Sequence, residues 1–339
     1  MNKDILKETI AELFSDHKGL LAMDESISTC NKRFAAAGIP ETVEMRRKYR
    51  ELIVTTKGLN EGIGGAILFD ETVRQNTKDG IQMAEALKRN GIIPGIKVDK
   101  HAKPMAGFRG EKITEGLDGL RERLEEYKTL GMRFAKWRAV ISIGENIPSV
   151  ECIEANAVAL ARYAALCQEA DIVPIVEPEV LMDGNHSIDK CYEVTEQVQK
   201  ILFYQLYKYR IETEGMILKP NMIIQGDESD EKNSVDKVAE YTVNCLLASV
   251  PANVPAVAFL SGGQPPELAT AHLNAINKNY KKRLPWTVSF SFARAIQQPA
   301  LEAWNGKDEN VEKAQALLYM RAKLNAIARS GQYNLSMEK

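Results

Sequence analysis

The sequence predicts a single-domain (β/α)8 barrel, also called a TIM barrel, and three observations lead to that prediction. Short apolar runs rich in β-branched residues alternate along the chain with longer amphipathic segments. Eight such runs occur, which is the number of parallel strands that closes into this barrel. No Pro/Ser-rich linker or change of composition divides the 339 residues, so we expect one barrel domain over 1–339, with an N-terminal helix and a short C-terminal tail.

The eight runs expected to form strands are short and mostly uncharged. In chain order they begin at Gly19 (GLLAM), Gly64 (GGAILF), Ile92 (IIPGIKVD), Phe134 (FAKWRAVI), Ile172 (IVPIVEPE), Gly215 (GMILKPNM), Ala256 (AVAFLSGG) and Trp286 (WTVSFSF). Helical periodicity fills the segments between them, for example at 116–131, 149–170 and 187–211. Strict alternation of strand and helix implies parallel strands joined by right-handed crossovers.

The composition argues against nucleic acid and membranes as partners. Lys and Arg number 44 against 46 Asp and Glu, and no block of one sign stands out. The longest uncharged stretch, 241–266, is interrupted by prolines and a glycine pair and does not read as a membrane span. The N-terminus lacks the apolar core of a signal peptide, and the five cysteines form no C-x-x-C pair. We expect a cytoplasmic protein with reduced thiols.

Polar side chains stand at the C-terminal ends of the predicted strands. Three pairs are spaced two residues apart, so the members of each pair project from the same side of a strand: Lys97 and Asp99, Lys136 and Arg138, Glu177 and Glu179. Four further residues directly follow apolar runs: Asp24, Lys219, Ser261 and Arg294. The C-terminal ends of barrel strands meet at one mouth, where barrel enzymes place their chemistry.

Each of these features has an ordinary explanation as well. A single strand-end charge is usually a solvated loop residue, although a set of them on most strands favours a functional site. The glycines of LSGGQ fit either a plain turn or a backbone cradle for phosphate, with Arg294 as its planar partner. The chain has four histidines, His17, His101, His186 and His272. They show no metal-ligand spacing, so we expect no metal and no cofactor.

The strand-end residues suggest imine chemistry. A lysine has an ordinary pKa near 10.4, and desolvation or a neighbouring cation such as Lys136 lowers it, which makes Lys219 a Schiff-base candidate. Imine formation needs an acid that expels water, and the carboxylates of Glu177 and Glu179 supply one if each raises the pKa of the other. Asp24 is placed to accept a proton from a substrate hydroxyl as a C–C bond breaks.

Ten motifs, in order along residues 19–333, resemble the class I (Schiff-base) fructose-bisphosphate aldolases. They read LLAMDESISTCNKRF, GAILFDET, GIKVDK, GLDGLRERLEEY, FAKWRAVISIGE, IVPIVEPEVLMDGNH, ILKPNM, FLSGGQ, LNAIN and AWNGK. The resemblance implies a (β/α)8 enzyme of glycolysis and gluconeogenesis, commonly a homotetramer. It implies reversible cleavage of fructose 1,6-bisphosphate to dihydroxyacetone phosphate and glyceraldehyde 3-phosphate, with small sugar phosphates as its partners.

The same resemblance assigns roles to residues. Lys219 matches the imine-forming lysine, Glu177 the dehydration acid and Asp24 the base at the C4 hydroxyl, while Glu179 and Lys136 match groups that orient and polarise. Four residues match the C1-phosphate site: Ser261, Gly262, Arg294 and the backbone N–H of Ala293. Five match groups around the rest of the sugar bisphosphate: Ser26, Thr29, Arg33, Lys97 and Arg138.

Three departures from the family pattern bear on phosphate affinity and turnover. IST follows DES where TGS is common, so the hydroxyl contact falls to Thr29; SFAR replaces SYGR, which puts a methyl group at Ala293. The chain ends GQYNLSMEK, without a terminal tyrosine.

Two alternatives remain open: another Schiff-base barrel, transaldolase-like or deoxyribose-phosphate-aldolase-like, and a catalytically silent phosphosugar sensor or scaffold. Subunit count and the use of fructose 1-phosphate or sedoheptulose bisphosphate stay open too.

Overall fold

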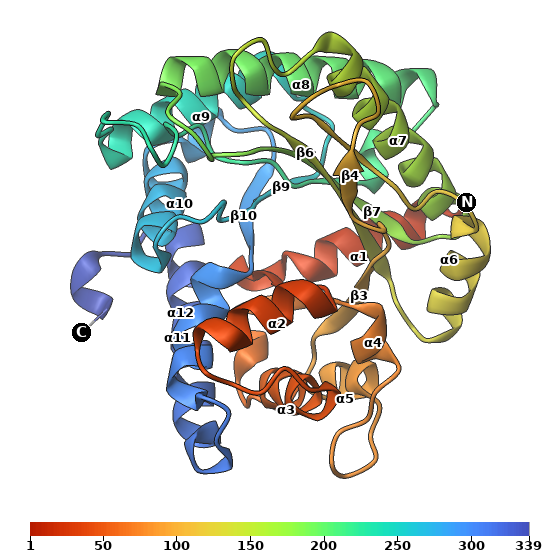
Figure 1. Ribbon diagram of the computed structural model, residues 1–339, viewed down its shortest axis with the longest axis vertical. Helices are drawn as coiled ribbons and strands as arrows, with labels where there is room; N and C mark the ends of the chain where they lie inside the picture. The colour runs from red at the N-terminus through yellow and green to blue at the C-terminus, as the bar shows by residue number, and fades with distance from the viewer. Residues whose placement is uncertain (339) are drawn as a thin grey trace.

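The computed structural model describes residues 1–338 and contains a closed barrel of eight parallel strands surrounded by helices (Figure 1). The strands are β1 (Gly19–Met23), β2 (Ile63–Leu68), β3 (Ile93–Lys97), β6 (Phe134–Ile141), β7 (Val173–Val180), β8 (Ile217–Leu218), β9 (Ala256–Phe259) and β10 (Thr287–Phe292). They pair in chain order and close where β1 pairs with β10. The predicted single-domain (β/α)8 fold is confirmed, and each strand overlaps one of the eight predicted runs; β2 begins at Ile63, just before its run, and β7 ends at Val180, just after its run.

Helices alternate with the strands as the periodicity predicted. They are α1 (Lys3–Leu13), α2 (Ile27–Ala36), α3 (Val43–Val54), α4 (Asp70–Val73), α5 (Met83–Arg89), α6 (Leu120–Thr129), α7 (Val150–Glu169), α8 (Ile188–Lys208), α9 (Val235–Ser249), α10 (Pro266–Tyr280), α11 (Arg294–Trp304) and α12 (Val311–Arg329). Serine caps begin three of the long helices, because Ser149, Ser187 and Ser234 each accept a hydrogen bond from a backbone N–H three residues later.

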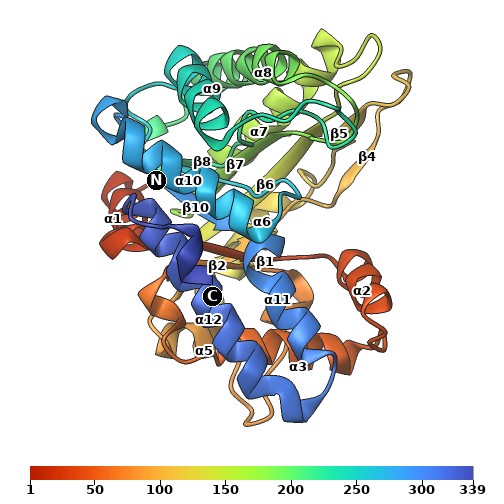
Figure 2. The ribbon, with the colours of Figure 1, turned by 90° about the vertical axis from the view of Figure 1, so that its left-hand side faces the viewer.

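The N-terminal helix α1 closes the end of the barrel opposite the mouth (Figure 2). Its apolar residues Leu6, Ile10 and Leu13 pack with inward-facing strand residues such as Phe134. The backbone of α1 comes very close to β2, since a Cβ on Gly64 would lie 2.0 Å from the carbonyl oxygen of Leu13. Glycine is therefore required at that position.

A two-stranded antiparallel hairpin, β4 (Ala102–Pro104) with β5 (Lys112–Thr114), follows β3 and was not predicted from the sequence. Strand β8 is shorter than its predicted run because Pro220, just beyond Lys219, has no N–H to donate to the ladder. Among residues 1–338, no helix is both long enough and apolar enough to span a membrane.

Candidate active site

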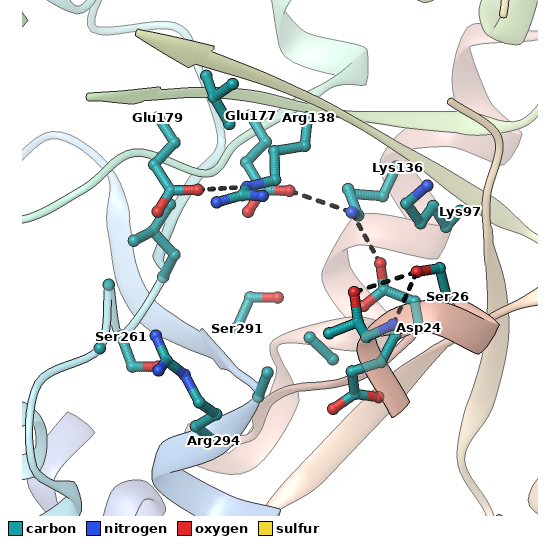
Figure 3. Close-up of a pocket in the computed structure, with 18 of the residues that line it drawn as sticks. Asp24, Ser26, Lys97, Lys136, Arg138, Glu177, Glu179, Ser261, Ser291 and Arg294 are labelled. Atoms are coloured by element: carbon teal, nitrogen blue, oxygen red, sulfur yellow. Dashed lines mark hydrogen bonds and ion pairs between the residues drawn. The ribbon is translucent and has the colours of Figure 1, made fainter. Parts of the chain in front are cut away.

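A cavity of about 770 Å³ opens at the C-terminal ends of the strands (Figure 3). Every site residue named from the sequence lines it: Asp24, Ser26, Thr29, Arg33, Lys97, Lys136, Arg138, Glu177, Glu179, Lys219, Ser261, Gly262, Ala293 and Arg294. The fold thus brings together residues from seven strands or the loops that follow them, because parallel strands direct all their C-terminal ends to one mouth.

Buried ion pairs link the centre of the cavity. Lys136 Nζ lies 2.7 Å from Asp24 Oδ2 and 3.4 Å from Glu177 Oε2, and Lys219 Nζ lies 3.0 Å from Glu177 Oε1. All four residues are less than 9% exposed. Charges this deeply buried are stable only when they are paired, so the two lysines and the two carboxylates depend on one another.

A third carboxylate, that of Asp99, lies at the centre of the cavity because the register of β3 and β6 brings two lysines together there. Lys97 on β3 stands directly opposite Lys136 on β6, which brings two cations together. Asp99 lies between them, with Oδ1 2.6 Å from Lys97 Nζ and Oδ2 3.9 Å from Lys136 Nζ. The spacing of Lys97 and Asp99 predicts that they share a strand face, and the structure adds Asp99 to the residues of the site.

Charge interactions set the ionisation of this cluster. Burial opposes the charge on Lys136, but Asp24, Glu177 and Asp99 outweigh it and hold the pKa of Lys136 well above its usual range. Burial would also raise the pKa of Asp24, yet Lys136 and Lys219 lower it to about 2. Asp24 is therefore a carboxylate and Lys136 an ammonium ion at neutral pH.

Two expectations about pairing need revision. The sequence predicts Lys136 as the cation beside Lys219, whereas the carboxylate of Glu177 contacts both ammonium groups through its two oxygens. The spacing of Glu177 and Glu179 predicts a carboxylate pair, whereas Glu179 accepts a hydrogen bond from Nε of Arg138. The physical reason is that each buried charge lowers its energy most by contact with an opposite charge.

A tight turn, residues 261–264, forms another wall of the cavity. Its central residues Gly262 and Gly263 have φ of 58° and 91°, a left-handed conformation that glycine adopts without strain. Arg294, the first residue of α11, packs on this turn, because a Cβ on Gly263 would lie 2.9 Å from Arg294 Nη2 (Figure 3). Ala293 has φ of −102°, so its backbone has no need of the glycine common in the family.

Helix α2 supplies the wall near Asp24. Ser26 is its N-cap and accepts a hydrogen bond from the N–H of Thr29, and Ser26 Oγ also lies 3.0 Å from Thr29 Oγ1. Arg33 binds Glu25 and Gln298, so its guanidinium is already anchored. The cavity thus combines a buried lysine, carboxylates beside it, and arginine and hydroxyl side chains on two walls.

A family model described as "Glycolytic: Fructose-bisphosphate aldolase class-I" matches residues 5–339. The chain belongs to the class I fructose-bisphosphate aldolase family. It is 57% identical over 335 residues to a probable fructose-bisphosphate aldolase class 1 of Xanthomonas campestris pv. campestris (98% of this chain, 99% of that protein). It is 49% identical over 316 residues to fructose-bisphosphate aldolase 4, cytosolic, of Arabidopsis thaliana (93% and 80%).

A solved structure agrees with this assignment. The fructose-bisphosphate aldolase of Plasmodium falciparum, in complex with TRAP and a small-molecule inhibitor, superposes with a TM-score of 0.95 at 44% identity. The match covers 98% of this chain and 96% of that one. The resemblance inferred from the ten motifs is therefore confirmed, and the chain is a class I aldolase.

The aldolase cavity also contains a residue that the sequence analysis missed. Ser291 on β10 is 1% exposed and lines the cavity, and its hydroxyl has no hydrogen-bond partner in the described part of the chain. Its position two residues before Ala293 was a usable signal, because alternate residues of a strand share one face, so Ser291 projects from the same side as Ala293. Tyr333, the tyrosine nearest the C-terminus, does not line the cavity, and its hydroxyl donates a hydrogen bond to Glu338.

Proposed function

We propose that this aldolase cleaves fructose 1,6-bisphosphate reversibly, through a Schiff base on Lys219, to dihydroxyacetone phosphate and glyceraldehyde 3-phosphate in glycolysis and gluconeogenesis. The observation that carries the proposal is the buried contact between Lys219 Nζ and Glu177 Oε1, at 3.0 Å, inside a cavity with an arginine and hydroxyl side chains on each of two walls. Membership of the class I family supports the reaction type.

In this mechanism Glu177 moves protons for Lys219. Glu177 takes a proton from the ammonium group, and the free amine attacks the C2 carbonyl to form a carbinolamine. The protonated Glu177 then returns the proton to the leaving hydroxyl, water departs and an iminium ion remains. Lys136, which stays charged, stabilises the oxygen during both steps.

Cleavage uses Asp24 and the iminium. Asp24 removes the proton of the C4 hydroxyl, the C3–C4 bond breaks, and its electron pair moves into the iminium to form an enamine while glyceraldehyde 3-phosphate leaves. Protonation of the enamine at C3 and hydrolysis then release dihydroxyacetone phosphate. The charges of Lys136 and Lys219 hold the pKa of Asp24 at about 2, so Asp24 is ionised and its carboxylate has lone pairs to accept the proton.

The two phosphates would bind on opposite walls. The turn at Ser261 and Gly262, with Arg294 and the N–H of Ala293, is proposed for the C1 phosphate. The remaining groups are proposed for the rest of the substrate: Ser26, Thr29, Arg33, Lys97 and Arg138. Glu179 then orients Arg138 through their ion pair.

A coupled assay of fructose 1,6-bisphosphate cleavage, with and without exhaustive EDTA treatment, tests the proposal. We expect full activity after chelation, because the iminium serves as the electron sink that a metal ion would otherwise supply. Activity lost to EDTA and restored by zinc would contradict the mechanism. Binding without turnover would favour the sensor alternative, and cleavage of other sugar phosphates only would favour another Schiff-base aldolase.

We further propose a homotetramer in the cytoplasm. Large apolar and aromatic side chains on α8 and α9 support an interface, with Tyr204 60%, Tyr207 80% and Leu247 38% exposed. The cytosolic relative from Arabidopsis supports the location, which cell fractionation would test. Light scattering should give a mass four times that of the chain. Tyr207→Glu should lower this measured mass, because it places a charge in the proposed apolar interface. A monomer in the parent protein would refute the tetramer.

A further inference from the structure

The phosphate-binding turn is held by a side chain as well as by its own backbone. The backbone N–H of Gln264 donates to the carbonyl oxygen of Ser261 at 3.0 Å, which closes the turn. The side-chain Nε2 of Gln264 donates to the same oxygen, also at 3.0 Å. The position of Ser261 and Gly262 therefore depends on which way the Gln264 side chain points.

His272 on α10 fixes the direction of that side chain. Its Nδ1 lies 2.6 Å from Gln264 Oε1. A backbone carbonyl only accepts hydrogen bonds, so the amide nitrogen of Gln264 must face Ser261 and the amide oxygen must face His272. Because that oxygen only accepts as well, Nδ1 of His272 must carry the proton.

The remaining ring nitrogen agrees with this assignment. His272 is 2% exposed, and its Nε2 is buried without a hydrogen-bond partner among residues 1–338. The other tautomer would leave a buried N–H at Nε2 without an acceptor and would also set the lone pair of Nδ1 against that of Gln264 Oε1. Burial also lowers the pKa of His272 to about 4, so the ring is uncharged at neutral pH and keeps a single proton.

We propose that His272 is a positioning residue for phosphate recognition: its Nδ1–H orients Gln264, and Gln264 holds the turn in the shape that binds the C1 phosphate. The inference rests on the proposed function, which places that phosphate on the turn. Hydrogen-bond donors that are held in place before the phosphate arrives bind it more tightly, because binding then costs no further conformational entropy in the turn. His272 itself lies behind the turn and touches no substrate.

Imine trapping with two related ligands tests the role of His272. Dihydroxyacetone phosphate carries the phosphate, and dihydroxyacetone lacks it; borohydride fixes either one on the same lysine. In His272→Leu we expect half-saturation with dihydroxyacetone phosphate to need about five-fold more ligand, the effect of one lost hydrogen bond. Trapping of dihydroxyacetone should not change. For cleavage, KM should rise while kcat changes little.

Two further variants separate positioning from folding. His272→Asn keeps a donor at the position of Nδ1 and should restore the parent behaviour. Asn277→Leu changes another buried polar residue of α10, whose amide donates to the carbonyl of Leu273, and should lower the melting temperature without altering the ratio of the two ligands. The inference would be overturned if His272→Leu weakened the binding of both ligands equally, or if it weakened the binding of neither.

The ring tautomer gives a test that needs no variant. Nitrogen-15 chemical shifts of His272 in the parent protein should report a proton on Nδ1 and a lone pair on Nε2 near neutral pH. A proton on Nε2 instead would overturn the inference even if all variants fold. If the parent protein traps no dihydroxyacetone phosphate on Lys219, the proposed function fails, and the tautomer still decides the contact between His272 and Gln264.

Discussion

Lys219→Met should abolish both cleavage and borohydride-dependent labelling by dihydroxyacetone phosphate. Methionine fills a similar volume but offers no amine, so the covalent route is lost, and we expect activity to fall by at least about 10⁴-fold. Peptide mapping by mass spectrometry should place the triose phosphate on Lys219 in the parent protein and find none in the variant.

Lys97→Met is the matched control for Lys219. Lys97 is a second lysine of the same cavity, bound to Asp99, and its removal should weaken substrate binding yet leave the label on Lys219. A label on Lys97 or Lys136 in the parent protein, or no label at all, would refute the assignment of the nucleophile.

Glu177→Gln and Asp24→Asn should block different steps, each with a loss of about 10² to 10⁴-fold. Glu177→Gln removes the proton carrier beside Lys219 and should slow both formation and release of the imine. Asp24→Asn should leave imine formation largely intact and stop C–C cleavage, so a hexose adduct should accumulate that borohydride traps. Rapid quenching followed by mass spectrometry distinguishes the triose adduct from the hexose adduct.

A buried carboxylate outside the cavity provides the comparison for these two variants. Glu111 is 5% exposed and binds Ser149, so Glu111→Gln tests for a general effect of a lost buried charge and should keep near-parent rates. If Asp24→Asn accumulated no hexose adduct, Asp24 would not be the base.

The pH dependence of stability and of the Asp24→Asn defect follows from the lowered pKa of Asp24. Its pKa in the folded protein lies below the ordinary value near 4, so the ionised form stabilises the fold above that value, and this contribution is lost as the pH falls toward 2. The defect of Asp24→Asn should therefore stay constant through the neutral range. Any acid limb of the activity near neutral pH must come from another group.

The sequence predicted through individual residues which end of the barrel holds the cavity. Lys136 and Glu177 interrupt apolar strands and Lys219 directly follows one, and a charge buried at such a position is costly without a function or a partner. The hairpin of β4 and β5 was missed because its strands are three residues long, too short for a periodic pattern. His272 was missed because its partner Gln264 is recognisable only once α10 packs behind the turn.

The sequence by itself determined the eight strands, their alternation with helices and the end of the barrel at which the named polar residues gather, since strand periodicity and parallel connection depend only on local pattern. The tertiary structure decided which charges pair: Glu177 with both lysines, Glu179 with Arg138, Asp99 between Lys97 and Lys136. Those pairs depend on strand register and on distances of a few ångströms. Because Coulomb energy varies inversely with distance, contacts at that scale select the partners, and a sequence does not contain them.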